Sequence, residues 1–388
     1  MRVFYLCYAD LHKPLGGTRH IIEVVQHLAG LGHSIDLFAQ GPAPDGLFSD
    51  RVRVHVVRTP SIRIVGWVLF YIKSAFAIWS EGRRNRPDVI YVREMVYNLF
   101  PGLASRALRA PLFIEVNGPI LDEMRMVGSG WFELWLIKTT QRFSLRSADC
   151  VVAVAEGLAD QLVDLYGIDR RRIVVIPNGT DPDLLQPGEE AESQRSLGME
   201  PGPIVGFLGS CYPYHDIDTL ITAAPAILEG CPNARFLIVG DGYMRASWME
   251  RTEREGLAAH FVFTGQTPYE EIARHINAFT VGIALFAQES HQKMNRSPMK
   301  LYDYMACGRS TIATDLIGLG DVVRDYNAGL TIPPNDAPAL AEAALTLLTD
   351  RRLSAEMGRC ARQAAVSYFN WGRVAEDIVR GIEERTKA

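Results

Sequence analysis

The chain has 388 residues, of which 48% are hydrophobic and 22% are charged, and its formal net charge is −5. This balance excludes long disordered regions, and the length predicts two α/β domains rather than one core. The six cysteines form no CxxC pair and no His/Cys cluster at metal-ligand spacing, which favours a reducing, cytoplasmic location and predicts no metal site. We expect no nucleic-acid partner.

Short apolar runs in the first half predict buried parallel strands, separated by segments of helical period. The first run stops at Ala9 and lacks the cleavage site of a signal peptide, so we interpret it as a strand. A helix over residues 18–31 would end at Gly32. Alternating strands and helices predict a parallel sheet with helices on both faces. The predicted strands cover residues 3–8, 35–38, 89–92, 112–116, 150–154 and 174–176.

Residues 61–80 are strongly apolar, and basic residues continue to position 86. Arg63 and Lys73 interrupt the run, whereas a membrane-spanning helix needs about 20 largely uncharged residues, so we do not predict one. Residues 50–149 carry 15 Lys/Arg against 9 Asp/Glu. Two interpretations follow: a helix buried against its own sheet, or a helix in residues 61–86 whose other face makes peripheral contact with an anionic membrane.

A dense group of turn formers at residues 177–183 ends the first series of strands. We place a hinge near residues 185–198, which gives an N-terminal acceptor-binding domain over residues 1–184 and a donor-binding domain over residues 185–366. Residues 367–388 would form a C-terminal helix that packs on the first domain. The second series of strands is predicted at residues 204–208, 235–239, 261–263, 281–285, 310–313 and 329–332, followed by helices at 338–348, 354–368 and 371–385.

Two segments have the chemistry of anion sites. Gly16 and Gly17 follow the first strand and open a helix, where free N–H groups and the helix dipole favour a diphosphate, although a plain tight turn is the alternative. The turn lacks the GxGxxG pattern of a dehydrogenase. The second segment, residues 297–308, opens a helix at Pro298 and offers Lys300 to a phosphate and Asp303 to ribose hydroxyls. Alternatively, Asp303 pairs with Lys300 at a solvated helix end.

The order and spacing of several motifs resemble those of the retaining GT-B glycosyltransferases of family 4 along almost the whole chain. The motifs are Gly16-Gly-Thr-Arg-His20, Gly32-His33, Val175-Ile-Pro-Asn-Gly179, Phe207-Leu-Gly-Ser210, Leu237-Ile-Val-Gly-Asp-Gly242, Phe263-Thr-Gly265, the run from Ser297 to Gly308, and Phe369-Asn-Trp371. The resemblance implies an α/β fold of two Rossmann-like, doubly wound domains that face each other across a cleft.

The same resemblance implies metal-independent retaining transfer from a nucleotide diphosphate sugar, most often a UDP- or GDP-sugar, to an acceptor hydroxyl. The acceptor would be a sugar, a lipid-linked glycan or a small molecule, as in polysaccharide or glycoconjugate assembly. Lys300, Asn117 and Asn295 would be catalytic. The donor would contact Gly16, Gly17, Ser210, His215, Gly265, Gln266, Thr267, Ser297, Met299 and Asp303.

Four positions depart from the family's usual residues. Asn295 stands where an acidic residue commonly contacts the donor sugar, and Glu289 is a nearby substitute. Ser210 and His215 stand where Arg and Lys often neutralise the diphosphate, which leaves that charge to Lys300. Lys293 or Arg296 could assist Lys300. Asn117 replaces a His after the predicted strand at residues 112–116, and it either contacts the transferred sugar or caps a turn.

The remaining alternatives concern single residues and other activities. Arg93 and Glu94 follow a strand, where they would bind the acceptor or form an ion pair. Asp216 and Asp218 have the spacing of a DxD site, but we expect them to open a helix, with Asp216 as cap. A nucleotide-sugar 2-epimerase and a catalytically inactive scaffold protein are the competing functions.

Overall fold

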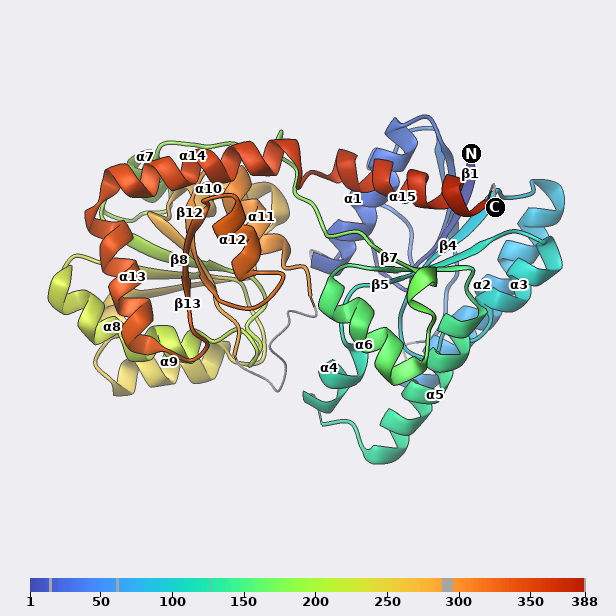
Figure 1. The fold of residues 1–388 in the computed structure, drawn as a ribbon, viewed down its shortest axis with the longest axis horizontal. Coiled ribbons are helices and arrows are strands. Elements are labelled where there is room, and N and C mark those ends of the chain that lie inside the picture. Colours follow the sequence, from blue (N-terminus) through green and yellow to red (C-terminus); the bar gives the residue numbers. More distant parts are fainter. Residues whose placement is uncertain (14–15, 61–62, 127, 288–295, 387–388) are drawn as a thin grey trace. The chain divides into compact units, whose positions relative to one another are not determined.

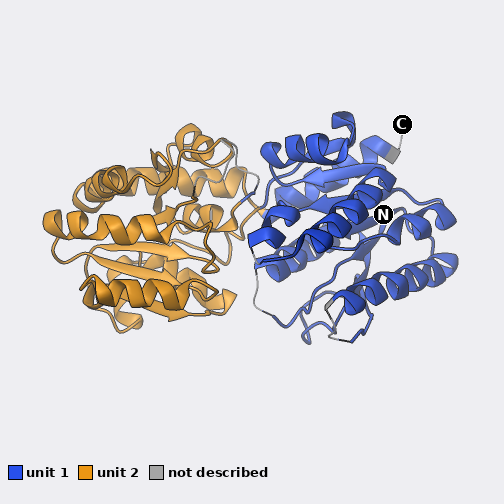
Figure 2. Cartoon of the chain, turned by 90° about the horizontal axis from the view of Figure 1, so that it is seen from below, with its two compact units in different colours: residues 1–178, 295–297, 371–388 blue, residues 179–294, 298–370 orange. Residues whose placement is uncertain are grey.

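The computed structural model describes residues 1–13, 16–60, 63–126, 128–287 and 296–386, and the chain forms two compact units (Figure 1). Unit 1 comprises Met1–Asn178, Asn295–Ser297 and Trp371–Ala388, and unit 2 comprises Gly179–Met294 and Pro298–Asn370 (Figure 2). Each unit has its own parallel sheet between helices. The predicted fold of two Rossmann-like domains is therefore confirmed.

The sheet of unit 1 has the order β3-β2-β1-β4-β5-β6-β7, and every pair of neighbours is parallel. Strand order reverses between β1 and β4, which makes this the switch point where ligands bind in such sheets. Its central strands are buried on both faces, as their β-branched and aromatic composition predicts. The strands are β1 (Arg2–Leu6), β2 (Ser34–Ala39), β3 (Val52–Val56), β4 (Val89–Arg93), β5 (Leu112–Val116), β6 (Cys150–Ala153) and β7 (Ile173–Val175).

Helices cover both faces of this sheet (Figure 1). One face carries the contact between α1 and α15, where the buried ring of Trp371 meets the ring of His20 edge-on at 5.2 Å. The other face carries α2, α3, α5 and α6, which contact one another in sequence. The helices are α1 (Gly16–Gly30), α2 (Arg63–Arg84), α3 (Pro101–Leu108), α4 (Ile120–Met126), α5 (Trp131–Ser147), α6 (Glu156–Tyr166), the 3-10 helix η1 (Arg170–Arg172) and α15 (Trp371–Thr386).

Helix α2 lies within the strongly apolar segment. By length and composition alone, Ile64–Arg84 meets the requirement for crossing a membrane, although its charges had argued against a span. One side of the helix packs into unit 1, where Phe70, Tyr71 and Ile78 are core residues. The opposite side exposes Ile72 and Phe76. The expected packing of this helix on its own domain is thus confirmed for one face.

Unit 2 has a six-stranded parallel sheet in the order β10-β9-β8-β11-β12-β13. Its strands are β8 (Ile204–Leu208), β9 (Arg235–Val239), β10 (Phe261–Gly265), β11 (Val281–Ala284), β12 (Ser310–Thr314) and β13 (Gly329–Ile332). Its helices are α7 (Glu190–Ser196), α8 (Ile217–Gly230), α9 (Arg245–Arg254), η2 (Ala258–His260), η3 (Tyr269–Glu271), α10 (Ile272–Asn277), α11 (Met299–Ala306), α12 (Gly320–Asp325), α13 (Ala337–Thr349) and α14 (Arg351–Ser367). Order reverses between β8 and β11.

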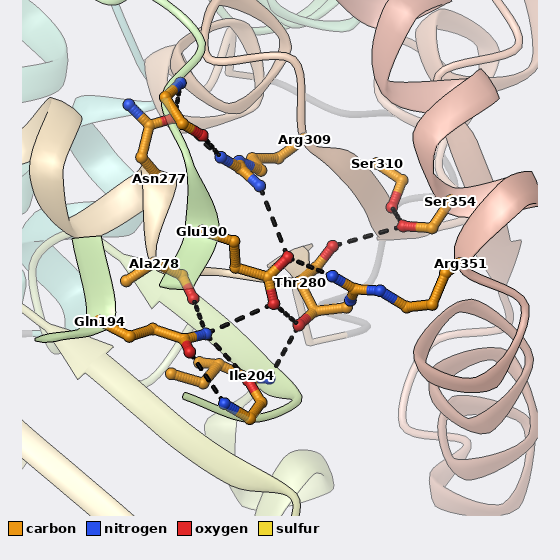
Figure 3. A network of polar contacts seen from close by, with 12 residues as sticks. Glu190, Gln194, Ile204, Asn277, Ala278, Thr280, Arg309, Ser310, Arg351 and Ser354 are labelled. Atoms are coloured by element: carbon orange, nitrogen blue, oxygen red, sulfur yellow. Dashed lines mark hydrogen bonds and ion pairs between the residues drawn. The ribbon is translucent and has the colours of Figure 1, made fainter. Parts of the chain in front are cut away.

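Helix α7 is fixed within unit 2 by a polar network (Figure 3). The carboxylate of Glu190 accepts a hydrogen bond from the Thr280 hydroxyl at 2.6 Å and pairs with Arg309 and Arg351. The amide of Gln194 donates to the carbonyl oxygen of Ala278 at 2.9 Å. Residues 185–198 therefore pack within unit 2, and the hinge placed there stays a prediction. The units divide earlier, at Asn178 and Gly179, and the C-terminal segment of unit 1 begins at Trp371 rather than at residue 367.

Candidate active site

The loops after β8 and β9 are joined at the carboxyl edge of the sheet in unit 2. The N–H of Gly209 donates to the carbonyl of Val239, and the N–H of Cys211 donates to the carbonyl of Asp241, each at 2.9 Å. Gly240 has φ of +132°, and a Cβ there would lie 2.0 Å from the carbonyl oxygen of Gly209. Only glycine allows this close approach, so the loop that carries Ser210 and His215 has a fixed position.

Lys300 lies at this edge, at the start of α11. Its Nζ atom lies 3.2 Å from Nδ1 of His215 and 3.3 Å from Nε2. It also lies 3.9 Å from the centre of the Phe207 ring and 5.8 Å from that of Phe286. Both aromatic faces attract a cation. The elements that hold Lys300 and His215, α11 and the loop before α8, follow β11 and β8, the two strands at the switch point.

The ammonium group of Lys300 is buried, and among the described ion pairs no carboxylate joins it. Burial lowers its pKa well below the ordinary value for lysine, because the charged form has lost its hydration. The alternative in which Asp303 pairs with Lys300 is therefore wrong. A buried cation without an opposite charge is suited to an anionic ligand, which would restore the pKa and stabilise the charged form.

Asp303 lies one turn further along α11 and is buried. One of its carboxylate oxygens accepts a hydrogen bond from the hydroxyl of Thr180 at 2.7 Å. Tyr304 holds the same helix to the sheet, because its hydroxyl accepts from the N–H of Leu208 at 2.7 Å. Ribose binding by Asp303 stays a prediction, and Thr180 is the residue beside it that sequence reasoning missed.

The other predicted donor contacts lie at several positions. Gly265 ends β10 with φ of +75°, and its carbonyl accepts from the N–H of Gly240 at 3.0 Å. Gln266 is exposed, while Thr267 and Met299 are half-buried. Ser297 belongs to unit 1, where its hydroxyl accepts from the N–H of Asn178 at 3.0 Å. Asn295, Glu289 and Lys293 lie outside the described residues.

Arg296, the expected assistant of Lys300, belongs to unit 1 and pairs with Glu123 of α4 at 3.3 Å. The Asp216 carboxylate accepts from the N–H of Thr219, so the expected helix cap is confirmed. Asp218 pairs with Arg251 at 2.7 Å. Among the described residues, no three His, Cys, Asp or Glu side chains are placed to share a metal ion.

The carboxyl edge of the sheet in unit 1 carries the second group of predicted residues. Gly16 and Gly17 open α1 and are exposed. A Cβ on Gly17 would lie 3.4 Å from Nη2 of Arg93, which ends β4, the other switch strand. Asn117 follows β5 and is half-buried, and its amide donates to the carboxylate of Glu115 at 2.9 Å. The structure therefore places Asn117 at the same edge as Gly16 and Gly17.

Glu115 is the centre of a buried polar cluster beneath this edge. Its carboxylate lies 2.5 Å from Nε2 of His20. Burial alone raises the pKa of Glu115, but the charges of His20 and Arg93 and the hydrogen bond from Asn117 lower it to about 2. Glu115 is therefore an anion at neutral pH. Sequence reasoning missed this pair, because no local pattern relates His20 to a carboxylate 95 residues away.

Glu94 and Arg93 are neighbours in sequence but do not form the ion pair offered as an alternative. Glu94 is buried, and it accepts a hydrogen bond from the amide of Asn98 at 2.9 Å. Burial raises the pKa of Glu94 to about 8, because no cation compensates the charged form. Glu94 therefore carries a proton at neutral pH, while Arg93 contributes to the cluster around Glu115.

Comparison with known proteins agrees with this geometry. The model for Glycosyltransferase Family 4 matches residues 15–184, and the model for Glycosyl transferases group 1 matches residues 202–350. A 2-deoxystreptamine N-acetyl-D-glucosaminyltransferase of Streptomyces fradiae is 28% identical over 95% of this chain and 90% of its own length. A D-inositol 3-phosphate glycosyltransferase of Nocardia farcinica is 32% identical over 61% of this chain, which corresponds to 52% of the relative.

The fold is also found among solved structures. HepE of Anabaena, in complex with UDP and glucose, superposes with a TM-score of 0.76 at 17% identity, and the match covers 99% of each chain. Likeness at this identity concerns the fold, which is GT-B. Together with the two family models, these findings show that the chain belongs to glycosyltransferase family 4 and is a nucleotide-sugar glycosyltransferase with the GT-B fold.

Proposed function

We propose that unit 2 binds the diphosphate of the donor through Lys300 and that the enzyme transfers the sugar with retention of configuration. The observation that carries this proposal is the buried ammonium group of Lys300, which lies 3.2 Å from His215 and has no carboxylate partner among the described ion pairs. A diphosphate at the carboxyl edge of the sheet would supply the missing negative charge. His215 adds a second positive charge when it is protonated.

The proposed donor is a UDP-sugar, with a GDP-sugar as the second candidate. Support comes from HepE, whose structure contains UDP and glucose. Gly265 ends β10, and Gln266 and Thr267 follow it at the same edge of the sheet as Lys300, which supports a base site at this turn. If backbone groups of this turn recognise the base, the side chains there do not indicate which base the enzyme prefers.

In the proposed reaction, the bond between the sugar and the diphosphate breaks while the acceptor hydroxyl enters on the same face. The departing phosphate takes the proton of that hydroxyl. Lys300 stabilises the negative charge that develops on the diphosphate, which is the largest contribution expected of a preorganised site. Asn117 and Asn295 are proposed to hold the transferred sugar by hydrogen bonds.

The proposed acceptor is polyhydroxylated, and unit 1 is proposed to bind it. The names of both relatives above contain a cyclitol, 2-deoxystreptamine or inositol phosphate, which supports a small molecule. A lipid-linked glycan is the second candidate, because α2 exposes Ile72 and Phe76 within residues 61–86. We propose a cytoplasmic enzyme in which this segment makes peripheral contact with the membrane.

The first experiment measures the melting temperature with UDP, GDP, ADP, dTDP and CMP in the presence of EDTA. A ligand at 100 times its Kd stabilises the protein by about 2.7 kcal/mol, which raises the melting temperature by a few degrees. We expect one diphosphate to do so for the wild type and for the control Arg352→Ala, but not for Lys300→Ala. A shift that survives Lys300→Ala would contradict the role of Lys300.

The two competing functions give other results in the same assays. An epimerase would convert the donor to an isomer without any acceptor. A scaffold protein would show no shift with any nucleotide. A shift that appears only when magnesium replaces EDTA would contradict the proposed metal independence.

A further inference from the structure

Helix α5 exposes a cluster of three aromatic rings at its N-terminal end. Trp131 is 81% exposed, Phe132 is 59% exposed and Trp135 is 56% exposed. The ring of Phe132 contacts those of Trp131 and Trp135, with centroids 5.8 and 5.9 Å apart. These rings form one apolar surface rather than three isolated side chains, and such surfaces mark interaction sites in soluble proteins.

Basic side chains continue the exposed face of α5 beyond the rings. Lys138, Arg142 and Arg146 are exposed on this helix, at spacings of four residues that place them on one side. The single acidic residue of the helix, Glu133, is half-buried, and the hydroxyl of Tyr97 donates to it at 3.4 Å. The exposed face therefore combines aromatic rings with positive charge and carries no acidic side chain.

A groove between α3 and α5 is lined by three arginines. It has a volume of about 340 Å³ and is lined by Arg106, Thr139, Arg142, Phe143, Arg146 and Ser147. Arg146 donates to the carbonyl of Tyr166 at 3.1 Å. Arg106 and Arg142 have no hydrogen-bond or ion-pair partner among the described residues. The phosphate of an anionic lipid headgroup would supply the negative charge and the acceptor oxygens with which Arg106 and Arg142 could pair.

We propose that the exposed face of α5, together with Arg106 of α3, docks on an anionic membrane surface. Tryptophan and phenylalanine insert at the boundary between headgroups and acyl chains, and basic residues on the same helix bind acidic headgroups. A second copy of the chain fits less well. A two-fold contact through this face would bring Lys138, Arg142 and Arg146 against their own copies, where like charges repel.

This docking surface goes beyond the transfer reaction and is separate from the proposed contact through residues 61–86. Helix α5 ends at Ser147, shortly before β6 begins at Cys150, so its aromatic end extends toward the carboxyl edge of the sheet. Gly17 and Asn117 lie at that edge. Docking through α5 would therefore bring the membrane surface to the side of unit 1 on which the acceptor is proposed to bind.

The test is sedimentation of the whole chain with phosphatidylcholine vesicles that contain or lack phosphatidylglycerol. Wild type is expected to bind only the anionic vesicles, and more weakly in high salt, because the Debye length shrinks from about 10 Å at 0.1 M to about 3 Å at 1 M. Two variants test the surface. One replaces Trp131, Phe132 and Trp135 by Ser, and the other replaces Arg106, Lys138 and Arg142 by Gln.

Loss of three basic charges should weaken binding on the order of 100-fold. The control variant carries Tyr243→Ser, Arg352→Gln and Arg359→Gln, which remove an exposed ring and two exposed charges from unit 2. It should bind like wild type. All variants should keep the circular dichroism spectrum and the nucleotide-induced melting shift of wild type, because the replaced side chains are exposed.

Three results would overturn the proposal. The first is anionic-vesicle binding that survives both α5 variants but disappears in Ile72→Ser/Phe76→Ser, which would assign the contact to α2. The second is a wild type that binds neither kind of vesicle. The third is a wild-type dimer that the aromatic variant converts to a monomer, which would identify a second copy as the occupant.

Discussion

Nε2 of His20 lies 2.5 Å from Oε1 of Glu115, and both side chains are almost fully buried beneath the carboxyl edge of the sheet in unit 1. The pair joins α1 to β5, and the His20 ring meets Trp371 of α15 edge-on. Three segments that are distant in sequence therefore meet at one buried contact between a histidine and a carboxylate. The pair also lies directly below Asn117, whose amide donates to the same carboxylate.

Removal of one member of this pair should strongly destabilise unit 1. His20→Ala leaves the buried carboxylate of Glu115 without its nearest partner, and breaking a buried pair in this way costs about 3–5 kcal/mol. Urea unfolding of His20→Ala should show this loss. His33→Ala, at a half-buried histidine near the N-terminus, should cost less than about 1 kcal/mol. Equal effects of the two substitutions would contradict a special role for the pair.

The same pair predicts that the protein loses stability in acid. The pKa of Glu115 is lowered to about 2, so its stabilising contribution is present above the ordinary pKa of about 4.3 and is lost as the pH falls toward 2. Burial lowers the pKa of His20, so the folded protein resists its protonation and also loses stability as the pH falls below about 6.5.

Urea unfolding between pH 7 and pH 3 measures this dependence. Glu115→Gln removes the contribution of the carboxylate, which is about 3 kcal/mol for a shift of this size. Its unfolding free energy should therefore fall less steeply below pH 4 than that of wild type. Parallel curves for the two proteins would show that other groups determine the acid sensitivity.

Lys300→Met should separate stability from donor binding. The methionine keeps most of the volume of the lysine and removes the cost of burying an amine without a carboxylate partner, so the unliganded protein should melt at a higher temperature than wild type. The nucleotide-induced shift should disappear, because the diphosphate loses its cation. A variant that is less stable than wild type would show that Lys300 already has a compensating partner in the unliganded protein.

The pKa of Lys300 gives this prediction a pH dependence. Because the pKa is lowered, the folded state binds fewer protons than the unfolded state, and stability rises with pH up to the ordinary lysine pKa of about 10.4. Lys300→Met should abolish this contribution. Unfolding measurements at pH 7 and pH 9 on both proteins would test it, since the difference in stability between them should shrink as the pH rises.

The sequence was sufficient for most of the fold because the central strands are short, largely apolar segments of four or five residues. β5, β8 and β9 have the predicted bounds. The edge strand β3 was missed, since Val52–Val56 alternates with Arg53 and His55 and is only half-buried. The division between the units at Asn178 and Gly179 was not predicted, because it depends on contacts such as that of Glu190 with Thr280, 90 residues away, which no local pattern reports.

The candidate site was predictable only at the level of residue types. The motif at the start of α11 indicated Lys300 as a phosphate ligand and Asp303 as a ribose ligand, with pairing between the two as the alternative. The structure gives Asp303 to Thr180 and places Lys300 beside His215. The exposure of the aromatic residues of α5 could not be predicted either. Their helical period fits a core as well as a surface, and only the tertiary packing shows that Trp131 faces outward.

Asn117 should affect turnover more than stability. Asn117→Ala removes one hydrogen bond to Glu115, which costs about 1 kcal/mol in unfolding free energy. If its amide also holds the transferred sugar, kcat should fall at least tenfold with little change in the nucleotide-induced melting shift. A variant with unchanged kcat would assign Asn117 to the turn before Gly118. Ser129→Ala, in the loop before α5, is the matched control and should leave kcat unchanged.

Glu94 predicts the opposite pH dependence from that of Glu115. Its pKa is raised to about 8 by burial, so the folded state keeps a proton that the unfolded state has released above about 4.3. Its contribution to stability is therefore full below about pH 4.3 and is lost as the pH rises to about 8.

Glu94→Gln cannot ionise, and its amide oxygen can still accept from Asn98. The variant should match wild type near pH 4 and exceed its unfolding free energy by several kcal/mol near pH 9, since each pKa unit corresponds to about 1.4 kcal/mol. Urea unfolding at both pH values tests this, with the exposed Glu356→Gln as control. Identical curves for Glu94→Gln and wild type would mean that the folded protein stabilises the charged carboxylate through groups near Asn98. In that case the carboxyl edge of the sheet in unit 1 would carry one more negative charge at neutral pH than it does with a protonated Glu94.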